Sequence, residues 1–254
     1  MISGRTRLVG LLGRPVAGSL SPRMQNAAFA ALALDWAYVP LEVAPERLPA
    51  AVEGLRALGF AGANVTIPHK AAVLPLCDEV DEVAERAGSV NTLVLRDGRV
   101  LGSSTDGEAV TGAVEAAAAE ALVLGAGGAA RAVVAALRDA GAARVRVAAR
   151  DRERAEELGE AAPWPPDAAG ATLVVNATPI RDELLVEPRP EQQVVDLAYR
   201  PDGAPTALVA AARAAGCRRV VDGLEVLVRQ GAASFERWTG LPAPVEIMRK
   251  ALVS

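Results

Sequence analysis

The chain has 254 residues, enough for one large domain or two of ordinary size, and 51% of them are hydrophobic. A net charge of −4 excludes the basic surface typical of nucleic-acid-binding proteins. Cys77, Cys217 and the single histidine, His69, fit no metal-ligand spacing, and no apolar run is long enough for a membrane span. The N-terminus lacks a signal-peptide pattern. We therefore expect a soluble cytoplasmic protein with a small-molecule partner, no nucleic acid, no membrane and no metal.

The first half of the chain alternates between strand and helix patterns. Apolar or alternating segments predict strands at 8–13, 36–43, 62–67, 89–95 and 99–102. Helical patterns lie between them at 46–58 and 69–86, and a helix from Ser21 to about residue 34 would have Ser21 as N-cap and Pro22 in its first turn. Asp97-Gly98 predicts a tight hairpin turn. This order indicates an α/β layer structure.

The second half repeats the alternation after an alanine-rich segment at 110–121, which predicts a helix. Strands are expected at 122–124, 145–147, 172–175, 194–197 and 219–221, with a helix from the glycine-rich turn to about residue 140. Such a series favours a parallel sheet. Helices at 224–238 and 244–252 should pack back on the first domain. We therefore predict a discontinuous domain of residues 1–108 plus 231–254, and a second domain of residues 109–230.

A glycine-rich turn joins the strand at 122–124 to the following helix and reads Gly-Ala-Gly-Gly-Ala-Ala at 125–130. This variant of the dinucleotide-binding pattern leaves the backbone open to a pyrophosphate, which the helix N-terminus attracts. Arg150 and Arg154 follow the next strand and favour the 2′-phosphate of NADP. NAD stays possible because Asp151 is acidic, although that residue is typical of a helix cap. The alternative is that these are paired surface charges.

Four polar clusters lie where strands are expected to end or helices to begin, at 19–22, 64–70, 90–92 and 103–107. The segment at 64–70, Asn-Val-Thr-Ile-Pro-His-Lys, bends around a proline, which leaves Asn64, Thr66 and Lys70 free to converge on a ligand. Taken singly, each cluster has a structural explanation as a cap, a turn or a solvated charge. Together they supply amide, hydroxyl, ammonium and carboxylate groups for a small polyhydroxylated acid.

These motifs, in this order, resemble those of the shikimate dehydrogenase family nearly from end to end. The matching segments lie at 13–22, 64–70, 88–92, 105–107, 125–131, 176–179 and 222–230. The resemblance implies two α/β domains, an N-terminal substrate and catalytic domain and a Rossmann-like, doubly wound NADP-binding domain, with the active site in the cleft between them. It also implies a monomer or homodimer that reduces 3-dehydroshikimate to shikimate with NADPH, reversibly, in chorismate and aromatic amino-acid biosynthesis.

The resemblance also implies roles for individual residues. Lys70 and Asp106 would form the catalytic pair. The residues expected to hold shikimate are Ser19, Ser21, Asn64, Thr66, Asn91, Asp106, Tyr199 and Gln230. Those expected to contact the cofactor are Gly125, Ala126, Gly127, Gly128, Ala129, Arg150, Arg154, Thr178, Leu197 and Gly223.

Two other functions remain open from the sequence. A quinate/shikimate dehydrogenase that prefers NAD would keep the same fold and catalytic pair. The acidic Asp151 after the strand is compatible with NAD. A nucleotide-binding sensor would keep the fold but would not catalyse a reaction. Loss of Lys70 or Asp106 would favour the sensor, and both are present.

Overall fold

The computed structural model describes residues 2–253, which form two compact units. Unit 1 contains the described residues up to Thr105 and those from Val228 onward, and unit 2 runs from Asp106 to Leu227. The sequence predicted these divisions after residues 108 and 230. The chain therefore passes between the units twice, once after Thr105 and once inside a helix.

Unit 1 is built on a six-stranded mixed sheet in the order β2-β1-β3-β5-β6-β4. Its strands are β1 Arg7–Gly13, β2 Trp36–Glu42, β3 Gly62–Val65, β4 Glu79–Val80, β5 Thr92–Arg96 and β6 Arg99–Ser103. Strand β1 is parallel to both β2 and β3, whereas β5 is antiparallel to β3 and β6. Asp97 and Gly98 join β5 to β6 with φ of 52° and 73°, as a two-residue hairpin turn requires, so that prediction is confirmed.

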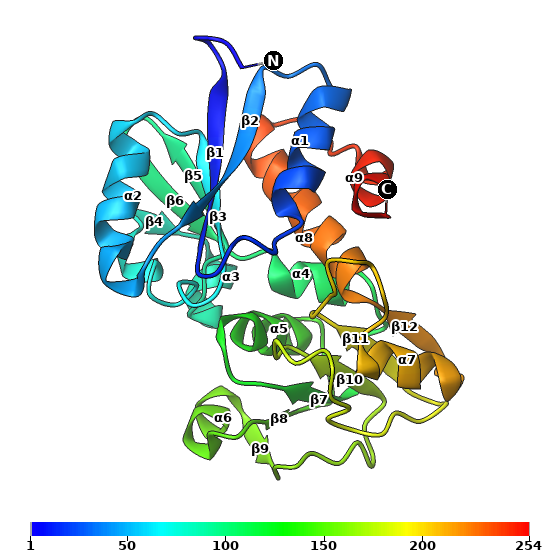
Figure 1. The fold of residues 1–254 in the computed structure, drawn as a ribbon. Coiled ribbons are helices and arrows are strands. Elements are labelled where there is room, and N and C mark those ends of the chain that lie inside the picture. The colour runs from blue at the N-terminus through cyan, green and yellow to red at the C-terminus, as the bar shows by residue number, and fades with distance from the viewer. Residues whose placement is uncertain (1, 254) are drawn as a thin grey trace. The chain divides into compact units, whose positions relative to one another are not determined.

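Helices cover both faces of this sheet (Figure 1). They are α1 Ser21–Ala31, α2 Leu48–Ala57, α3 Glu82–Ala87, α8 Gly223–Thr239 and α9 Val245–Val253. On one face, Leu48, Val52 and Leu55 line one side of α2 and pack in the same apolar cluster as the strands. On the other, the ring of Phe29 in α1 lies 5.4 Å from that of Phe235 in α8. Helix α9 packs against α1.

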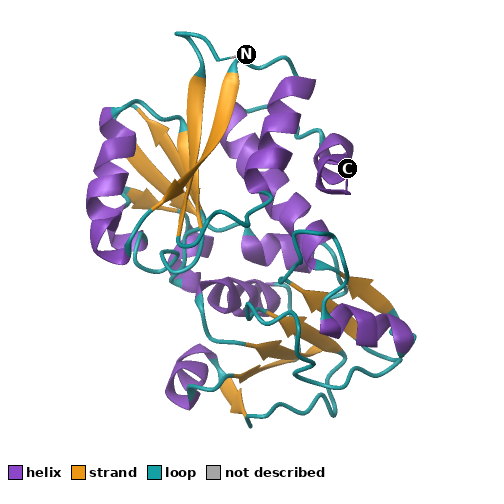
Figure 2. Ribbon diagram, in the orientation of Figure 1, coloured by secondary structure: helices purple, strands orange, loops and turns teal. Residues whose placement is uncertain are grey.

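Unit 2 is built on a fully parallel six-stranded sheet in the order β12-β11-β10-β7-β8-β9. Figure 2 draws strands in orange and helices in purple. The strands of unit 2 are β7 Glu120–Leu124, β8 Arg144–Ala148, β9 Glu160–Ala162, β10 Leu173–Asn176, β11 Gln193–Asp196 and β12 Arg219–Val221. Its helices, besides the start of α8, are α4 Asp106–Thr111, α5 Gly128–Asp139, α6 Arg152–Leu158 and α7 Ala207–Ala214. This arrangement confirms the predicted α/β class with a doubly wound domain.

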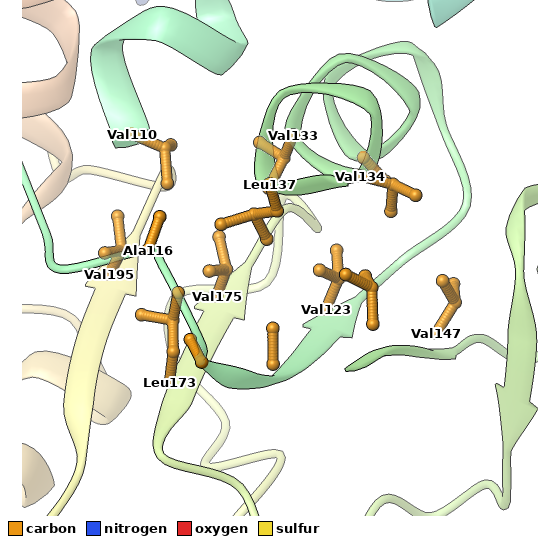
Figure 3. Close-up of a cluster of buried hydrophobic side chains, with 14 of the residues drawn as sticks. Val110, Ala116, Val123, Val133, Val134, Leu137, Val147, Leu173, Val175 and Val195 are labelled. Carbon is orange, nitrogen blue, oxygen red and sulfur yellow. The ribbon is translucent and has the colours of Figure 1, made fainter. Parts of the chain in front are cut away.

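Alternate residues of the strands in unit 2 face different helices. Val123 of β7 belongs to the cluster that includes Val133 and Leu137 of α5 (Figure 3). Its neighbour Leu122 instead packs with Leu208 of α7. Because both faces are covered, every residue of the central strands β10 and β11 is buried, and valines fill the middle of each, as is usual in parallel sheets.

Two of the predicted helices are wrong. Residues 69–86 form turns, a short 3₁₀ helix at Leu74–Leu76, strand β4 and helix α3 instead of one helix. Pro75 lacks an N–H group and interrupts a helix there, while Asp78 turns the chain toward β6 by accepting a hydrogen bond from the Val100 N–H at 2.6 Å. Residues 112–119 are irregular: the Gln193 side chain bonds both the N–H and the carbonyl of Glu115, and Ala118 takes a φ of 58° that no right-handed helix can include.

Helix α1 begins and ends earlier than the sequence predicts. Ser21 is the first residue of the helix rather than its N-cap. The N-cap is Leu20, whose side chain makes no capping hydrogen bond. The helix stops at Ala31, and Ala33 takes a φ of 52° that no right-handed helix can include. Within residues 2–253, none of the helices has the length and apolar character needed to cross a membrane.

Candidate functional site

Three strands of unit 1 deliver polar residues to one edge of its sheet. Asn64 near the end of β3 pairs with Thr92 at the start of β5, and Thr92 pairs with Ser103 at the end of β6. Because β5 runs antiparallel to its neighbours, its first residue lies beside their last ones. Segments that are far apart in sequence therefore meet here, as the polar clusters suggested.

Asn91 lies at the centre of a buried hydrogen-bond network at this edge. Its Oδ1 accepts bonds from the Thr105 N–H at 2.9 Å and the Thr92 hydroxyl at 3.0 Å. Its Nδ2 donates to Thr105 Oγ1 at 2.9 Å and, more weakly, to Gln230 Oε1 at 3.5 Å. The Thr105 hydroxyl in turn donates to the Gln230 carbonyl at 3.1 Å. Asn91 and Gln230, both expected to hold the substrate, are thus held together by Thr105.

Asn64 and Ser234 extend this network into helix α8. Asn64 Nδ2 lies 3.0 Å from both Ser234 Oγ and the Asn91 carbonyl, and its Oδ1 accepts from the Tyr38 hydroxyl at 2.9 Å. The Ser234 and Thr92 hydroxyls are 2.7 Å apart. Ser234 is fully buried and was not singled out from the sequence, because a serine inside a helix has no local signal of a role. Its place becomes visible only once α8 packs on the sheet.

The segment at 64–70 closes against the end of β1. The Thr66 N–H donates to the Leu12 carbonyl at 2.8 Å, and a Cβ on Gly13 would lie only 2.3 Å from Thr66 Cγ2. Because no larger residue fits at position 13, Gly13 permits this close packing. Buried His69 has its Nε2 2.8 Å from the Val43 carbonyl, which anchors the turn just before Lys70. The histidine therefore acts as a structural residue.

Lys70 is half-buried and is one of only two lysines in the chain. Its carbonyl accepts a 2.8 Å bond from the Val90 N–H, next to Asn91. Half-buried Ser19 lies in the loop that follows β1, and its hydroxyl accepts from the Ser21 N–H at 3.2 Å. The backbone at Lys70 and the network around Asn91 are thus joined through the same short segment.

Asp106 is the first residue of α4, directly after Thr105, and it is buried. A carboxylate at this end of a helix is stabilised by the helix dipole. A Cβ on the next residue, Gly107, would lie 2.5 Å from the Ala132 carbonyl oxygen in α5. Gly107 therefore lets α4 pack closely on α5, which fixes the backbone that carries Asp106.

The glycine-rich turn of unit 2 has the geometry that a dinucleotide needs. Gly125 has a φ of 104°, which other residues rarely adopt, and its N–H donates to the Ala148 carbonyl at 2.8 Å. A Cβ on Gly127 would meet nothing within 4 Å, so space lies open beside this backbone. Gly127 is also the N-cap of α5 and provides no side-chain cap. The first N–H groups of α5 therefore remain for an anion, and the turn fits the pyrophosphate of NADP.

The order of the strands places a switch point between β7 and β10, whose following loops lead to opposite sides of the sheet. A Cβ on Gly125, after β7, would lie 3.1 Å from Thr178 Cγ2, after β10. Thr178 is held by Asn176, whose Oδ1 accepts from the Thr178 N–H at 3.0 Å and from its hydroxyl at 2.7 Å. Thr178 is thus fixed at the point where parallel sheets bind their ligands.

Asp196 at the end of β11 was not predicted, although it is fully buried. Its Oδ1 accepts from Asn176 Nδ2 at 2.8 Å and the Ala198 N–H at 2.9 Å, and its Oδ2 accepts from the Thr206 hydroxyl at 2.5 Å. Burial raises the pKa of Asp196 to about 6; these three bonds lower the pKa, and the carboxylate of Asp222 adds a smaller increase. The signal in the sequence was an acidic residue directly after the two buried valines, Val194 and Val195.

Asp151 lies after β8, between Arg150 and Arg154, and the structure shows what its carboxylate does. Asp151 is the N-cap of α6, as expected, because its Oδ1 accepts from the Arg154 N–H at 3.2 Å. Its Oδ2 also lies 3.1 Å from Arg154 Nε. Arg150 is exposed in the turn between β8 and α6. Asp151 is therefore engaged with its own helix, which leaves Arg150 better placed than Asp151 to meet a cofactor.

The remaining predicted residues of unit 2 lie after β11 and at the start of α8. Leu197 and Tyr199 are half-buried in the loop that follows Asp196. Gly223 begins α8, and a Cβ there would lie 2.1 Å from the Ala198 carbonyl oxygen. Gly223 is thus required for close packing of α8 on this loop. In residues 2–253, His, Cys, Asp and Glu side chains form no group of three or more that could hold a metal ion.

Three family models match the chain. The shikimate dehydrogenase substrate binding domain matches residues 11–93, shikimate / quinate 5-dehydrogenase matches residues 108–164, and the shikimate 5′-dehydrogenase C-terminal domain matches residues 223–253. Together they fall in both units. The family resemblance inferred from the motifs is therefore confirmed.

Individual relatives agree with the family models. The shikimate dehydrogenase (NADP(+)) of Moorella thermoacetica is 44% identical over 280 residues, which cover 99% of this chain and 94% of the relative. A solved shikimate dehydrogenase in complex with NADP⁺ is 34% identical with a TM-score of 0.92, covering 100% of this chain and 96% of its own. The enzyme of Thermus thermophilus, in complex with NADP(H) and shikimate, is 37% identical with a TM-score of 0.86, covering 97% of this chain and 98% of its own. Because the motifs, the fold and these relatives agree over nearly the whole chain, this protein belongs to the shikimate dehydrogenase family.

Proposed function

We propose that the protein is an NADP-dependent shikimate dehydrogenase, which reduces 3-dehydroshikimate to shikimate reversibly in aromatic amino-acid biosynthesis. The observation that carries this proposal is the 44% identity to a shikimate dehydrogenase (NADP(+)) over 99% of the chain. The polar edge of unit 1 and the glycine-rich turn of unit 2 support it, since they offer groups for a hydroxylated acid and for a dinucleotide.

Unit 2 supplies the groups that would hold NADP. The backbone N–H groups of the 125–129 turn and the start of α5 bind the pyrophosphate, and Arg150 and Arg154 bind the 2′-phosphate. Thr178, Leu197 and Gly223 border the nicotinamide half. When bound, NADPH supplies the hydride.

The polar groups that would hold the substrate come mainly from unit 1. The hydroxyls of Ser19, Ser21 and Thr66 and the amides of Asn91 and Gln230 bind the carboxylate and ring hydroxyls. Asn64 has its amide engaged by Ser234, Asn91 and Tyr38, so it acts by supporting Asn91. The side chains of Ser19, Asn91 and Gln230 are already hydrogen-bonded within the protein, so they favour one orientation of a polyhydroxylated ring over others.

Lys70 and Asp106 perform the proton chemistry. As the ring carbonyl at C3 is reduced, negative charge develops on its oxygen, and the Lys70 ammonium stabilises this charge and donates its proton to that oxygen. In the reverse direction the neutral amine accepts the proton of the alcohol. Asp106 accepts a hydrogen bond from a ring hydroxyl, which fixes the face that the substrate presents.

The proposal extends to the form and location of the protein. It is a monomer or homodimer in the cytoplasm, where Cys77 and Cys217, both unpaired in the structure, stay reduced. Light scattering coupled to size-exclusion chromatography measures the mass against the 26.1 kDa of one chain. A stable tetramer would contradict the expected assembly without affecting the reaction.

Steady-state rates test the reaction itself. The absorbance of the reduced cofactor is followed with shikimate and then quinate, each with NADP⁺ and NAD⁺. We expect kcat/KM to be largest for shikimate with NADP⁺. A preference for quinate and NAD⁺ would favour the quinate/shikimate alternative, and cofactor binding without turnover on either acid would favour a sensor.

A further inference from the structure

Asp196 joins three segments of unit 2 through one carboxylate. Its donors are the Asn176 side chain at the end of β10, the Ala198 N–H after β11 and the Thr206 hydroxyl before α7, all between 2.5 and 2.9 Å away. All three donors are uncharged, and the residue is fully buried. Burying a carboxylate without a cation is costly, so its presence calls for a reason.

The hydrogen bonds continue from Asp196 to the glycine-rich turn. A carboxylate only accepts hydrogen bonds, so it fixes the Asn176 amide with its NH₂ group toward Asp196. The amide oxygen of Asn176 is thereby turned toward the N–H and hydroxyl of Thr178. Thr178 then packs on Gly125, at the switch point of the sheet. The Ile180 carbonyl, which accepts from Asn176 Nδ2 at 3.1 Å, favours the same orientation. A neutral amide at position 196 would accept the bond from Asn176 more weakly than the carboxylate does, because it carries no charge.

Gln192, at the amino end of β11, joins loops through hydrogen bonds as Asp196 does at the carboxyl end, but without a charge. Gln192 directly precedes β11 and is also fully buried. Its Nε2 donates to the carbonyls of Ala168 and Ala171 at 2.9 Å, and its Oε1 accepts from the Arg189 N–H at 2.9 Å. A neutral amide is therefore sufficient to join loops at the amino edge, where no predicted ligand group lies. The buried charged residue of β11, Asp196, lies at the carboxyl end of the strand.

We propose that Asp196 is a positioning residue for the dinucleotide: through Asn176 it holds Thr178 against Gly125, and through the Ala198 N–H it holds the loop that leads to Tyr199. It touches neither cofactor nor substrate. This inference rests on the proposed function, because it assumes that the glycine-rich turn binds NADP(H).

Direct binding of NADPH, followed by its fluorescence without substrate, tests the inference. The variants are Asp196→Ala, Asp196→Asn and the matched control Gln192→Ala, each with its stability measured by urea unfolding. Because displacement of a binding group by about 1 Å costs up to about a hundredfold, we expect Asp196→Ala to raise the Kd by about tenfold to a hundredfold. Asp196→Asn keeps the shape of the side chain and should raise it by about two- to fivefold.

Gln192→Ala should lower stability while leaving the Kd for NADPH within about twofold of the parent value, since it removes a comparable number of buried bonds far from the turn. Unchanged binding in Asp196→Ala would overturn the inference, as would an equal loss of binding in Gln192→Ala. If Asp196→Ala does not fold, unchanged binding in Asp196→Asn overturns it. Failure of the parent protein to bind NADPH would instead overturn the proposed function, and this inference with it.

Discussion

The buried carboxylate of Asp196 should make the protein less stable as the pH rises. Its pKa increases from 3.8 in the unfolded chain to about 6 in the folded one, so at about 1.4 kcal/mol per unit its ionisation costs about 3 kcal/mol of stability. Because the folded-state pKa is the higher, protonated Asp196 contributes stability that is fully present below the unfolded-state pKa. This contribution is lost as the pH rises through about 6. Between about pH 5 and about pH 8 the loss amounts to about 1.4 kcal/mol.

Asp196→Asn removes this titration and keeps the shape of the side chain. Its Oδ1 can accept from Asn176 and the Ala198 N–H, and its NH₂ group can donate to the Thr206 hydroxyl. The free energy of unfolding in urea, followed by circular dichroism, is measured for both proteins from pH 5 to pH 8. The value for the variant minus that for the parent should rise by about 1.4 kcal/mol across this range. A difference that stays constant refutes the reasoning.

Three other substitutions test the site. Lys70→Ala should lower kcat by about 10²- to 10⁴-fold with little change in KM, whereas Lys250→Ala, at the only other lysine, should change neither; near-normal turnover would remove Lys70 from the mechanism. Ser234→Ala removes a hydrogen-bond partner from Asn64 Nδ2, the Thr92 hydroxyl and the Gln230 carbonyl in the preceding turn and should raise the KM for shikimate about tenfold, at about 1–3 kcal/mol. Thr239→Ala, which removes a similar bond to the preceding turn of α8, should leave that KM unchanged, so an equal effect would mean that α8 is merely destabilised. Gly127→Ala puts a methyl group into open space and should raise the Kd for NADPH at least about tenfold without loss of stability; unaltered binding would show that the cofactor does not approach this residue.

The sequence predicted best those features whose signal is local. The strand, turn and helix around Gly125 follow from glycine spacing, and the hairpin follows from Asp97-Gly98, since each needs only a few adjacent residues. The predicted helix at 69–86 failed because the chain there is organised by a distant partner, the β6 strand, through Asp78. The predicted helix over the alanines at 112–119 failed for a related reason: the backbone of Glu115 is bonded to the side chain of the distant Gln193, in β11.

The residues of the candidate site also differ in whether their signal in the sequence is local or depends on distant partners. Polar residues at strand ends could be named in advance, because such ends are where α/β proteins bind ligands. Ser234 could not, since its partners lie in other elements and the contacts depend on strand order and register. Asp196 had a signal at its strand end, but the bonds that it accepts from Asn176 and Thr206 are visible only in the structure. Asn64 was expected to face a ligand, and only the structure reveals how many of its hydrogen bonds are already made within the protein.

Helix α8 has a consequence for how the protein is made. It begins in unit 2 and continues into unit 1, so the chain completes unit 2 while the last piece of unit 1 is still to be synthesised. Until the residues after Leu227 leave the ribosome, Phe29 on α1 lacks Phe235, which covers it in the finished protein. Domains fold as units during translation. Unit 1, whose synthesis begins first, should therefore complete its folding after unit 2. Until then, one apolar face of its sheet stays partly uncovered.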